Sequence, residues 1–177
     1  VLTVEMPEDP SLYVPTLIGL NDFNVTKITE EDKQRGKMYL DQRRRTEFQK
    51  TTTDFKEYLK QLGIKVIIKN ANEFTIPRIS QLTLKTNQFN LTTKRYQEED
   101  IRKFVEDQNK IVECAQIQDK FGDNGITSVY IINKENEQEW FIDTFLLSCR
   151  VIGRGIEDAL LSQIIKRAKM EGVKKVK

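Results

Sequence analysis

The stretch "FIDTFLLSCRVIGRGIEDALL", residues 141–161, changes character in its middle and decides the fold. It opens as an apolar run rich in β-formers and closes with apolar residues at helical spacing. Between them lies Arg150-Val-Ile-Gly153-Arg154-Gly155. Glycines at a strand-to-helix transition permit positive φ and let an anion approach the backbone without a Cβ in the way. The stretch therefore predicts either a plain turn or an anion-binding turn.

An anion-binding turn would use the N-terminus of the helix that follows it. The first N–H groups of a helix have no partner within the helix and carry a partial positive charge, which suits a phosphate. Gly153, Arg154 and Gly155 would supply backbone amides, and the side chains of Arg150 and Arg154 would add charge. These four residues are the candidate cofactor-binding residues.

Upstream of this turn, three segments are typical of strands: "IVECAQIQDKF", "GITSVYIIN" and "EWFIDTFLLSCRV". The first two are separated by Gly122-Asp-Asn-Gly125, which predicts a hairpin turn because Gly and Asn accept positive φ. Asp119 and Asp123 flank it, and we expect turn chemistry from both. "KENEQ" predicts the second hairpin loop.

Before these strands, "KVIIKNAN" predicts a strand, and two helices follow it in "TIPRISQLTLKTNQF", with Thr75 as the expected N-cap, and "RYQEEDIRKFVEDQN". After the turn, "GIEDALLSQIIKRAKMEG" predicts a helix with Ile156, Leu160, Ile164 and Ala168 on one face, and "VKKVK" begins another strand. The predicted order from residue 64 is β-α-α-β-β-β-α-β. This order resembles the N-terminal part of the GNAT acyltransferase fold, a mixed sheet with flanking helices.

Residues 11–62 predict mainly helix. "SLYVPTLIGLNDF" indicates a short helix interrupted by Pro15, and one long or two successive helices follow, with Thr29 as N-cap and Gly63 as the end. Their apolar stripe is thin, so we expect them to pack on something else; it consists of Met38, Leu40, Phe48, Phe55, Leu59 and Leu62. The basic cluster "DQRRRTEFQK" is interleaved with acids and predicts a solvated helix face.

Composition excludes several classes of function. The chain has 177 residues and a net charge of +2, too small a basic bias for a dedicated nucleic-acid domain. It has no histidine and only two cysteines, which excludes a histidine-bearing metal site or triad and a disulfide scaffold. No apolar run is long enough to cross a bilayer. With only two cysteines, a reducing cytoplasm is the default location. The sequence begins with an apolar, strand-like run and stops just after a new strand begins, so we expect it to be a piece of a longer protein.

The blocks "RISQLTLKTNQFNLTTKRY", "DKFGDNG" and "WFIDTFLLSCRVIGRGIEDALL" resemble the C-terminal region of FkbH-like proteins, the HAD-superfamily phosphatase subfamily IIIC or glyceryl transferase family. The resemblance implies a HAD-domain tail at residues 1–10, a helical linker at 11–62, and a GNAT-like domain at 63–177 that lacks its C-terminal part. Arg150-x-x-Gly153-x-Gly155 resembles the pyrophosphate signature of GNAT enzymes, which implies that the anion is the pyrophosphate of coenzyme A or, by extension, the phosphopantetheine of a carrier protein.

The function implied by this resemblance is help in transferring a glyceryl-type acyl group to an acyl carrier protein in polyketide-type, methoxymalonyl biosynthesis. The partners would be that carrier protein and the preceding HAD domain, with neither nucleic acid nor membrane. Mg²⁺ would enter only through the HAD domain, because this sequence contains no Asp-x-Asp motif. The alternatives are a non-catalytic carrier-binding module and a simple acetyl-CoA-dependent N-acetyltransferase.

The resemblance also implies substrate-site residues, through their position between the first two helices of the GNAT-like unit. The loop at residues 85–93 would wall the acceptor site through Asn87, Gln88, Asn90 and Thr92, although an ordinary loop could have the same composition. No metal ligands are predicted.

Two candidate catalytic residues lie on the third of these strands. Strand alternation places Asp143, Phe145, Leu147 and Cys149 on one face. Asp143 is predicted as a general base, with a hydrogen-bonded structural carboxylate as the alternative. Cys149 could carry an acyl group as a thioester, although a small core residue is the more frequent role; Cys114 is interpreted as core.

Overall fold

The computed structural model describes residues 3–20 and 33–177, and the chain divides into two compact units, Val1–Arg35 and Gly36–Lys177. The first unit contains a 3₁₀ turn, η1 (Pro10–Leu12), and a helix, α1 (Tyr13–Ile18). The Asp9 side chain accepts a hydrogen bond from the Ser11 amide at 2.9 Å and caps the turn. The expected short helix is present, with Pro15 inside it. Thr29 lies outside the described residues.

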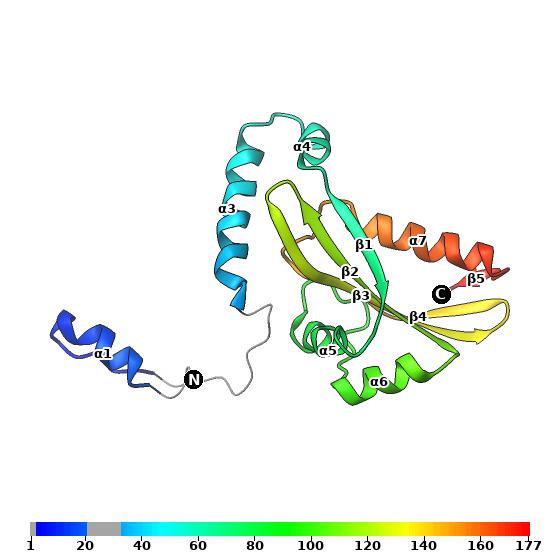
Figure 1. Ribbon diagram of the computed structural model, residues 1–177, viewed down its shortest axis with the longest axis horizontal. Helices are drawn as coiled ribbons and strands as arrows, with labels where there is room; N and C mark the ends of the chain where they lie inside the picture. The colour runs from blue at the N-terminus through cyan, green and yellow to red at the C-terminus, as the bar shows by residue number, and fades with distance from the viewer. Residues whose placement is uncertain (1–2, 21–32) are drawn as a thin grey trace. The chain divides into compact units, whose positions relative to one another are not determined.

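The second unit follows the predicted order of elements (Figure 1). Two helices come first, α3 (Arg35–Lys50) and α4 (Phe55–Leu62), and α4 ends at Gly63 with φ 63° as expected. The remaining elements are β1 (Lys65–Asn70), α5 (Ile76–Lys85), α6 (Glu98–Glu106), β2 (Lys110–Asp119), β3 (Gly122–Asn136), β4 (Glu139–Leu147), α7 (Ile156–Met170) and β5 (Lys175–Val176). This confirms the order β-α-α-β-β-β-α-β and the mixed α/β fold.

The sheet has the strand order β1-β2-β3-β4-β5, in which the first four strands are antiparallel and β5 runs parallel to β4 (Figure 1). One face packs against α7, where the four predicted positions are all buried: Ile156, Leu160, Ile164 and Ala168. The other face packs against α5 and α6, which contribute Ile76, Ile79, Leu82 and Ile101. The helical periodicity therefore predicted the buried faces correctly, because each helix presents its apolar stripe to one sheet face. Thr75 occupies the N-cap position of α5, but its side chain makes no capping bond there.

The hairpin between β2 and β3 differs from the prediction. Its turn is the pair Lys120 and Phe121, and Asp119 already pairs with Gly122. The predicted turn residues lie inside β3, where the register shifts and Gly125 has φ 68°. Residues with positive φ suit a β-bulge as well as a turn, so composition alone could not separate the two.

The alternation predicted for β4 is also wrong along part of the strand. Ile131 pairs with Thr144 and Ile132 pairs with Ile142, so Asp143 is an extra residue in a bulge. The bulge resets the alternation: Ile142 packs with the same α7-side cluster as Phe145. Asp143 instead hydrogen-bonds to Thr144 and to Tyr96, a residue of the α5–α6 side.

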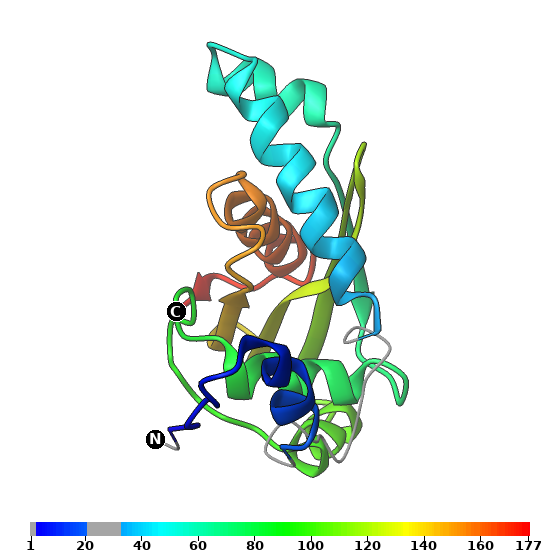
Figure 2. The ribbon, with the colours of Figure 1, turned by 90° about the vertical axis from the view of Figure 1, so that its left-hand side faces the viewer.

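The prediction that the basic cluster of α3 lies on a solvated face is wrong for two of its charged residues. Asp41 and Arg45 are 3% and 2% exposed. Figure 2 shows α3 alongside the sheet, and Arg45 binds Asp119 at the end of β2 at 2.7 Å. Met38 and Leu62 of the apolar stripe are buried, whereas Leu40 and Phe55 are exposed. A helix with few apolar residues packs here through the buried Arg45–Asp119 ion pair together with the buried Met38, and hydrophobic periodicity does not detect such an ion pair.

Candidate functional site

The turn between β4 and α7 spans residues 148–155. Gly153 and Gly155 adopt the left-handed region, with φ 76° and 73°, which non-glycine residues rarely adopt. Upstream, the Val151 amide donates to the Ser148 carbonyl at 3.1 Å, and the Val151 side chain is fully buried. The turn is thus anchored by an apolar residue, and both glycines have the conformation that makes them necessary.

The backbone of this turn is open. In the described part of the chain, no protein atom accepts a hydrogen bond from the amides of residues 153–155. A Cβ built on either glycine would meet no other atom within 4 Å. Gly155 is the N-cap of α7 and supplies no side-chain cap. These are free N–H groups at the positive end of a 15-residue helix, the arrangement that binds phosphate groups in proteins.

The two arginines of the motif do not share one role. The Arg154 side chain is 9% exposed and lies 3.5 Å from Asp119, and it donates to Gln42 Oε1 at 3.2 Å. Burial lowers the pKa of its guanidinium. Arg150 is half-buried, and its Nη1 donates to Met38 Sδ at 2.6 Å. The charge that Arg154 was expected to add to the turn is therefore directed to the protein interior.

The first turn of α7 carries two acids, Glu157 and Asp158. Like charges repel, so these carboxylates weaken the binding of an anion at this helix end. The free glycine amides therefore have to supply most of the attraction for an anion here.

The two cysteines lie in opposite environments. Cys114 is 1% exposed, which confirms its assignment to the core, and burial raises the pKa of its thiol. Cys149 is exposed because β4 ends at Leu147, two residues earlier. The interpretation of Cys149 as a core residue is wrong, and its role as an acyl carrier stays a prediction.

Asp143 lies at the centre of a polar cluster formed with Lys94, Tyr96 and Thr144. Lys94 Nζ lies 2.5 Å from its carboxylate, and the Tyr96 and Thr144 hydroxyls donate to it at 2.7 and 3.0 Å. Desolvation by burial acts to raise the pKa of Asp143, but these hydrogen bonds and the Lys94 charge outweigh it and lower the pKa. Burial, followed by the hydrogen bond to Asp143, raises the pKa of the Tyr96 hydroxyl. The geometry favours the structural alternative for Asp143, since a carboxylate with a lowered pKa is a weaker base.

The loop at residues 85–93 lies along the edge of β4. Asn90 bridges to Leu146, the Leu91 amide donates to the Phe145 carbonyl at 3.1 Å, and the Leu147 amide donates to Phe89 at 3.0 Å. The loop therefore lies between the Asp143 cluster and the glycine turn, which are separated along β4 by about 13 Å at the usual strand rise.

The four predicted substrate residues of this loop are placed differently. Asn90 is 8% exposed, and its side chain bonds to Thr86 and Thr93. The Asn87 side chain accepts from Arg95, and Gln88 is exposed. The Thr92 hydroxyl is buried without a hydrogen-bond partner in the described structure. Gln88 is thus the residue of this set whose polar group is most available to a ligand, whereas the Thr92 hydroxyl is closed off from solvent.

Sequence reasoning missed Lys94 and Tyr96 beside Asp143, and Arg45 and Gln42 beside Arg154. No local pattern marks them, because their partners are 47 to 112 residues away. Within the described ranges, no group of three or more acidic or cysteine side chains could hold a metal ion. No helix among the described residues is long and apolar enough to span a bilayer.

No family model matches the sequence, and no curated protein matches it. Among solved structures, the chain is similar to the ribosomal-protein-S18-alanine N-acetyltransferase from Escherichia coli, with 13% identity and a TM-score of 0.47 over 62% of this chain and 63% of that one. For the ribosomal-protein-alanine N-acetyltransferase from Brucella melitensis biovar Abortus 2308, the values are 16% and 0.49 over 63% and 77%.

A third similar structure is a GNAT family acetyltransferase from Elizabethkingia anophelis with acetyl-CoA bound, with 19% identity and a TM-score of 0.43 over 63% of this chain and 62% of that one. This chain spans less than two thirds of the Escherichia coli and Elizabethkingia proteins. Because the identities are below 20% and the scores below 0.5, we do not transfer the activities of these proteins to this chain. The fold assignment rests on the element order and sheet topology described above.

Proposed function

We propose that this chain binds the phosphate groups of a coenzyme A-type thioester and is part of an acyltransferase. The observation that carries the proposal is the turn at residues 148–155, whose glycine-rich backbone leaves three successive amides without a protein acceptor at the start of α7. Phosphate oxygens would accept hydrogen bonds from those amides and gain from the helix dipole. Arg150, at the start of the same motif, would contribute charge.

Transfer from acyl-CoA to an amine is the form of this activity that we propose first. It requires a thioester site and an acceptor site, and we assign the turn at residues 148–155 to the first and the loop at residues 85–93 to the second. This loop would flank the acyl group, with Gln88 as a polar contact. Lys94 and Tyr96, held by Asp143, would lie beyond it. We propose a positioning role for Asp143 because its lowered pKa makes proton uptake less favourable.

Glyceryl transfer to an acyl carrier protein, implied by the resemblance to FkbH-like proteins, is the second proposal. It uses the same phosphopantetheine chemistry but also requires a HAD-type centre, whose Asp-x-Asp motif this sequence does not contain. The assignment of residues 1–10 to such a domain, and the carrier protein as partner, are part of this second proposal. A non-catalytic carrier-binding module would show binding without turnover.

The experiment compares two glycines at opposite ends of α7. Gly155 and Gly172 have φ 73° and 76°, and both have open space where a Cβ would be. Gly155→Val and Gly172→Val therefore impose similar backbone strain. We expect Gly155→Val to abolish binding of coenzyme A in calorimetry and Gly172→Val to retain it. Equal affinity in both variants would refute the anion-binding turn.

Turnover then separates the two forms of the activity. Acetyl-CoA with a panel of amines should give acylated amine if the first form is right. Acylation of a phosphopantetheinylated carrier protein would favour the second, whereas binding of that carrier without acylation of either carrier or amine would favour the non-catalytic module.

A further inference from the structure

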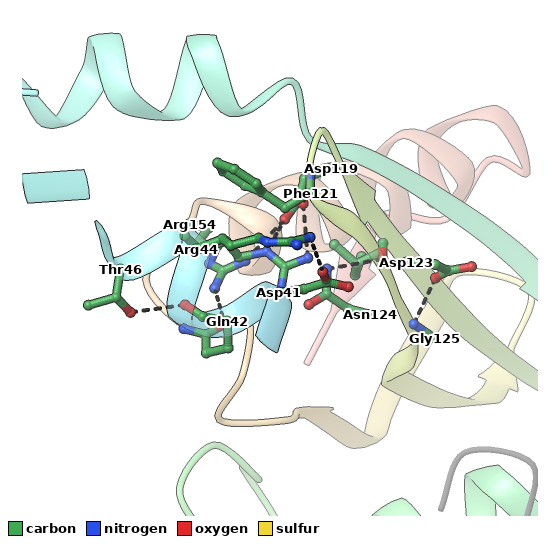
Figure 3. A network of polar contacts seen from close by, with 12 residues as sticks. Asp41, Gln42, Arg44, Thr46, Asp119, Phe121, Asp123, Asn124, Gly125 and Arg154 are labelled. Carbon is green, nitrogen blue, oxygen red and sulfur yellow. Dashed lines mark hydrogen bonds and ion pairs between the residues drawn. The ribbon is translucent and has the colours of Figure 1, made fainter. Parts of the chain in front are cut away.

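Arg154 lies between the two left-handed glycines, yet its side chain leaves the turn and enters the protein. Its guanidinium reaches Asp119 at the end of β2 and Gln42 on α3 (Figure 3). The turn is therefore tied to two elements that are 35 and 112 residues away in the sequence.

The partner of Arg154 is itself fixed. The side chain of Asp119 is fully buried, and its carboxylate accepts two hydrogen bonds from Arg45, from Nε at 2.7 Å and from Nη2 at 2.9 Å. The Phe121 amide donates a further bond at 3.0 Å. A two-pronged Arg–carboxylate pair restricts the orientation of both groups, so the Asp119 carboxylate is held in a fixed direction 3.5 Å from Arg154 Nη1, an ion-pair contact without a hydrogen bond.

The anchored Arg154 side chain bears on the backbone of the turn, whose N–H groups meet no protein acceptor. A side chain held inside the protein would limit rotation of the short backbone between Gly153 and Gly155. Two free glycines without such an anchor would sample many conformations, at an entropic cost to any ligand that needs one of them.

We infer that Arg45, Asp119 and Gln42 are positioning residues for the anion-binding turn, acting through Arg154. This inference rests on the proposed function for the role of the turn, and it extends that function to α3, a helix that the sequence assigns to a linker. Arg154 is then an internal anchor of the turn, and the anion is bound by backbone amides.

The test uses the same substitution at two positions of α3. Arg45 is buried on Asp119, whereas Arg43 is 79% exposed and pairs with Glu47. Arg45→Gln and Arg43→Gln remove the same charge from the same helix. We expect Arg45→Gln to weaken binding of coenzyme A about tenfold or more and Arg43→Gln to leave it unchanged.

A second readout needs no ligand. The ¹⁵N order parameters of the Gly153 and Gly155 amides should fall from about 0.85 to below about 0.6 in Arg45→Gln and stay high in Arg43→Gln. If Arg45→Gln does not fold, Gln42→Ala serves instead, because it removes one contact of Arg154 and leaves the Asp119 pair intact.

The outcomes distinguish the proposed function of the turn from the positioning role of Arg45, Asp119 and Gln42. If wild-type protein binds no coenzyme A, the proposed function fails, while the order parameters still decide the positioning role. If the wild type binds and the turn keeps both its order and its affinity in Arg45→Gln, or in Gln42→Ala where that variant is used, the positioning role is overturned and the anion-binding turn stands.

Discussion

Asp119 and Asp143 are two buried aspartates on the same sheet, and each binds a cation from a distant segment. Asp119 and its partner Arg45 are 0% and 2% exposed, so both charges are sealed from solvent. The side chain of Asp143 is 8% exposed, but that of its partner Lys94 is 44% exposed. A bidentate ion pair that is shielded from solvent holds its two segments in one arrangement, whereas a single contact to a half-exposed lysine can break and re-form. The difference indicates that Asp119 serves architecture and that the region of Asp143 is where a partner can be exchanged.

The largest expected effect follows from breaking the sealed pair. Arg45→Met should lower the free energy of unfolding by about 3–5 kcal/mol, because Asp119 would remain buried without its main counter-charge. Chemical denaturation measures this loss, with Arg43→Met, on the exposed face of α3, as the control expected to stay within about 0.5 kcal/mol. A loss below about 1 kcal/mol for Arg45→Met would contradict the sealed pair.

A second substitution tests how closely α3 packs against the hairpin of β2 and β3. A Cβ at Gly122 would lie 2.6 Å from Asp41 Oδ2, a buried carboxylate of α3. Gly122→Ala should therefore displace the Asp41 carboxylate and strain the backbone, which has φ 154° there, and destabilise the protein by about 1–3 kcal/mol in thermal unfolding. Gly36→Ala, on α3 with no atom within 4 Å of the new Cβ, should stabilise it by up to about 1 kcal/mol. Equal shifts in both variants would argue against the close contact.

The Asp143 cluster should respond to pH. Its pKa is lowered from 3.8 in the folded protein, so the stabilisation is present above pH 3.8 and is lost as the pH falls through the folded value. Asp143→Asn should cost about 1–3 kcal/mol at pH 7, and the difference from wild type should shrink below pH 3.8. Urea denaturation at several pH values measures it. A difference that is constant with pH would mean that the carboxylate charge contributes nothing.

The smallest effect is expected at the exposed partner. Lys94→Met should change stability by no more than about 1 kcal/mol, because the ammonium is partly solvated and its ion pair is screened. It should also raise the pKa of Asp143, observable by NMR titration of the carboxyl carbon. A loss as large as that of Arg45→Met would erase the contrast between the two clusters.

The glycine turn shows how far sequence reasoning reaches into the candidate site. Its location, the two necessary glycines and the free helix start followed from local rules, since positive φ and the orphan amides belong to neighbouring residues. The direction of Arg154 did not follow, because it depends on Asp119 and Gln42. Cys149 shows the same limit, since its exposure depends on where pairing with β3 stops.

The sequence by itself determined the order of helices and strands, the apolar faces of α5 and α7, and the position of the turn. These features depend on periodicity and on residues a few positions apart. Only the tertiary structure decided the bulge at Asp143, the hairpin turn at Lys120 and Phe121, and the docking of α3. The docking of α3 depends on the pair of Arg45 with Asp119, 74 positions away, and a local pattern carries no information about such a partner. The bulge and the hairpin turn depend on the register in which neighbouring strands pair, which composition alone does not determine.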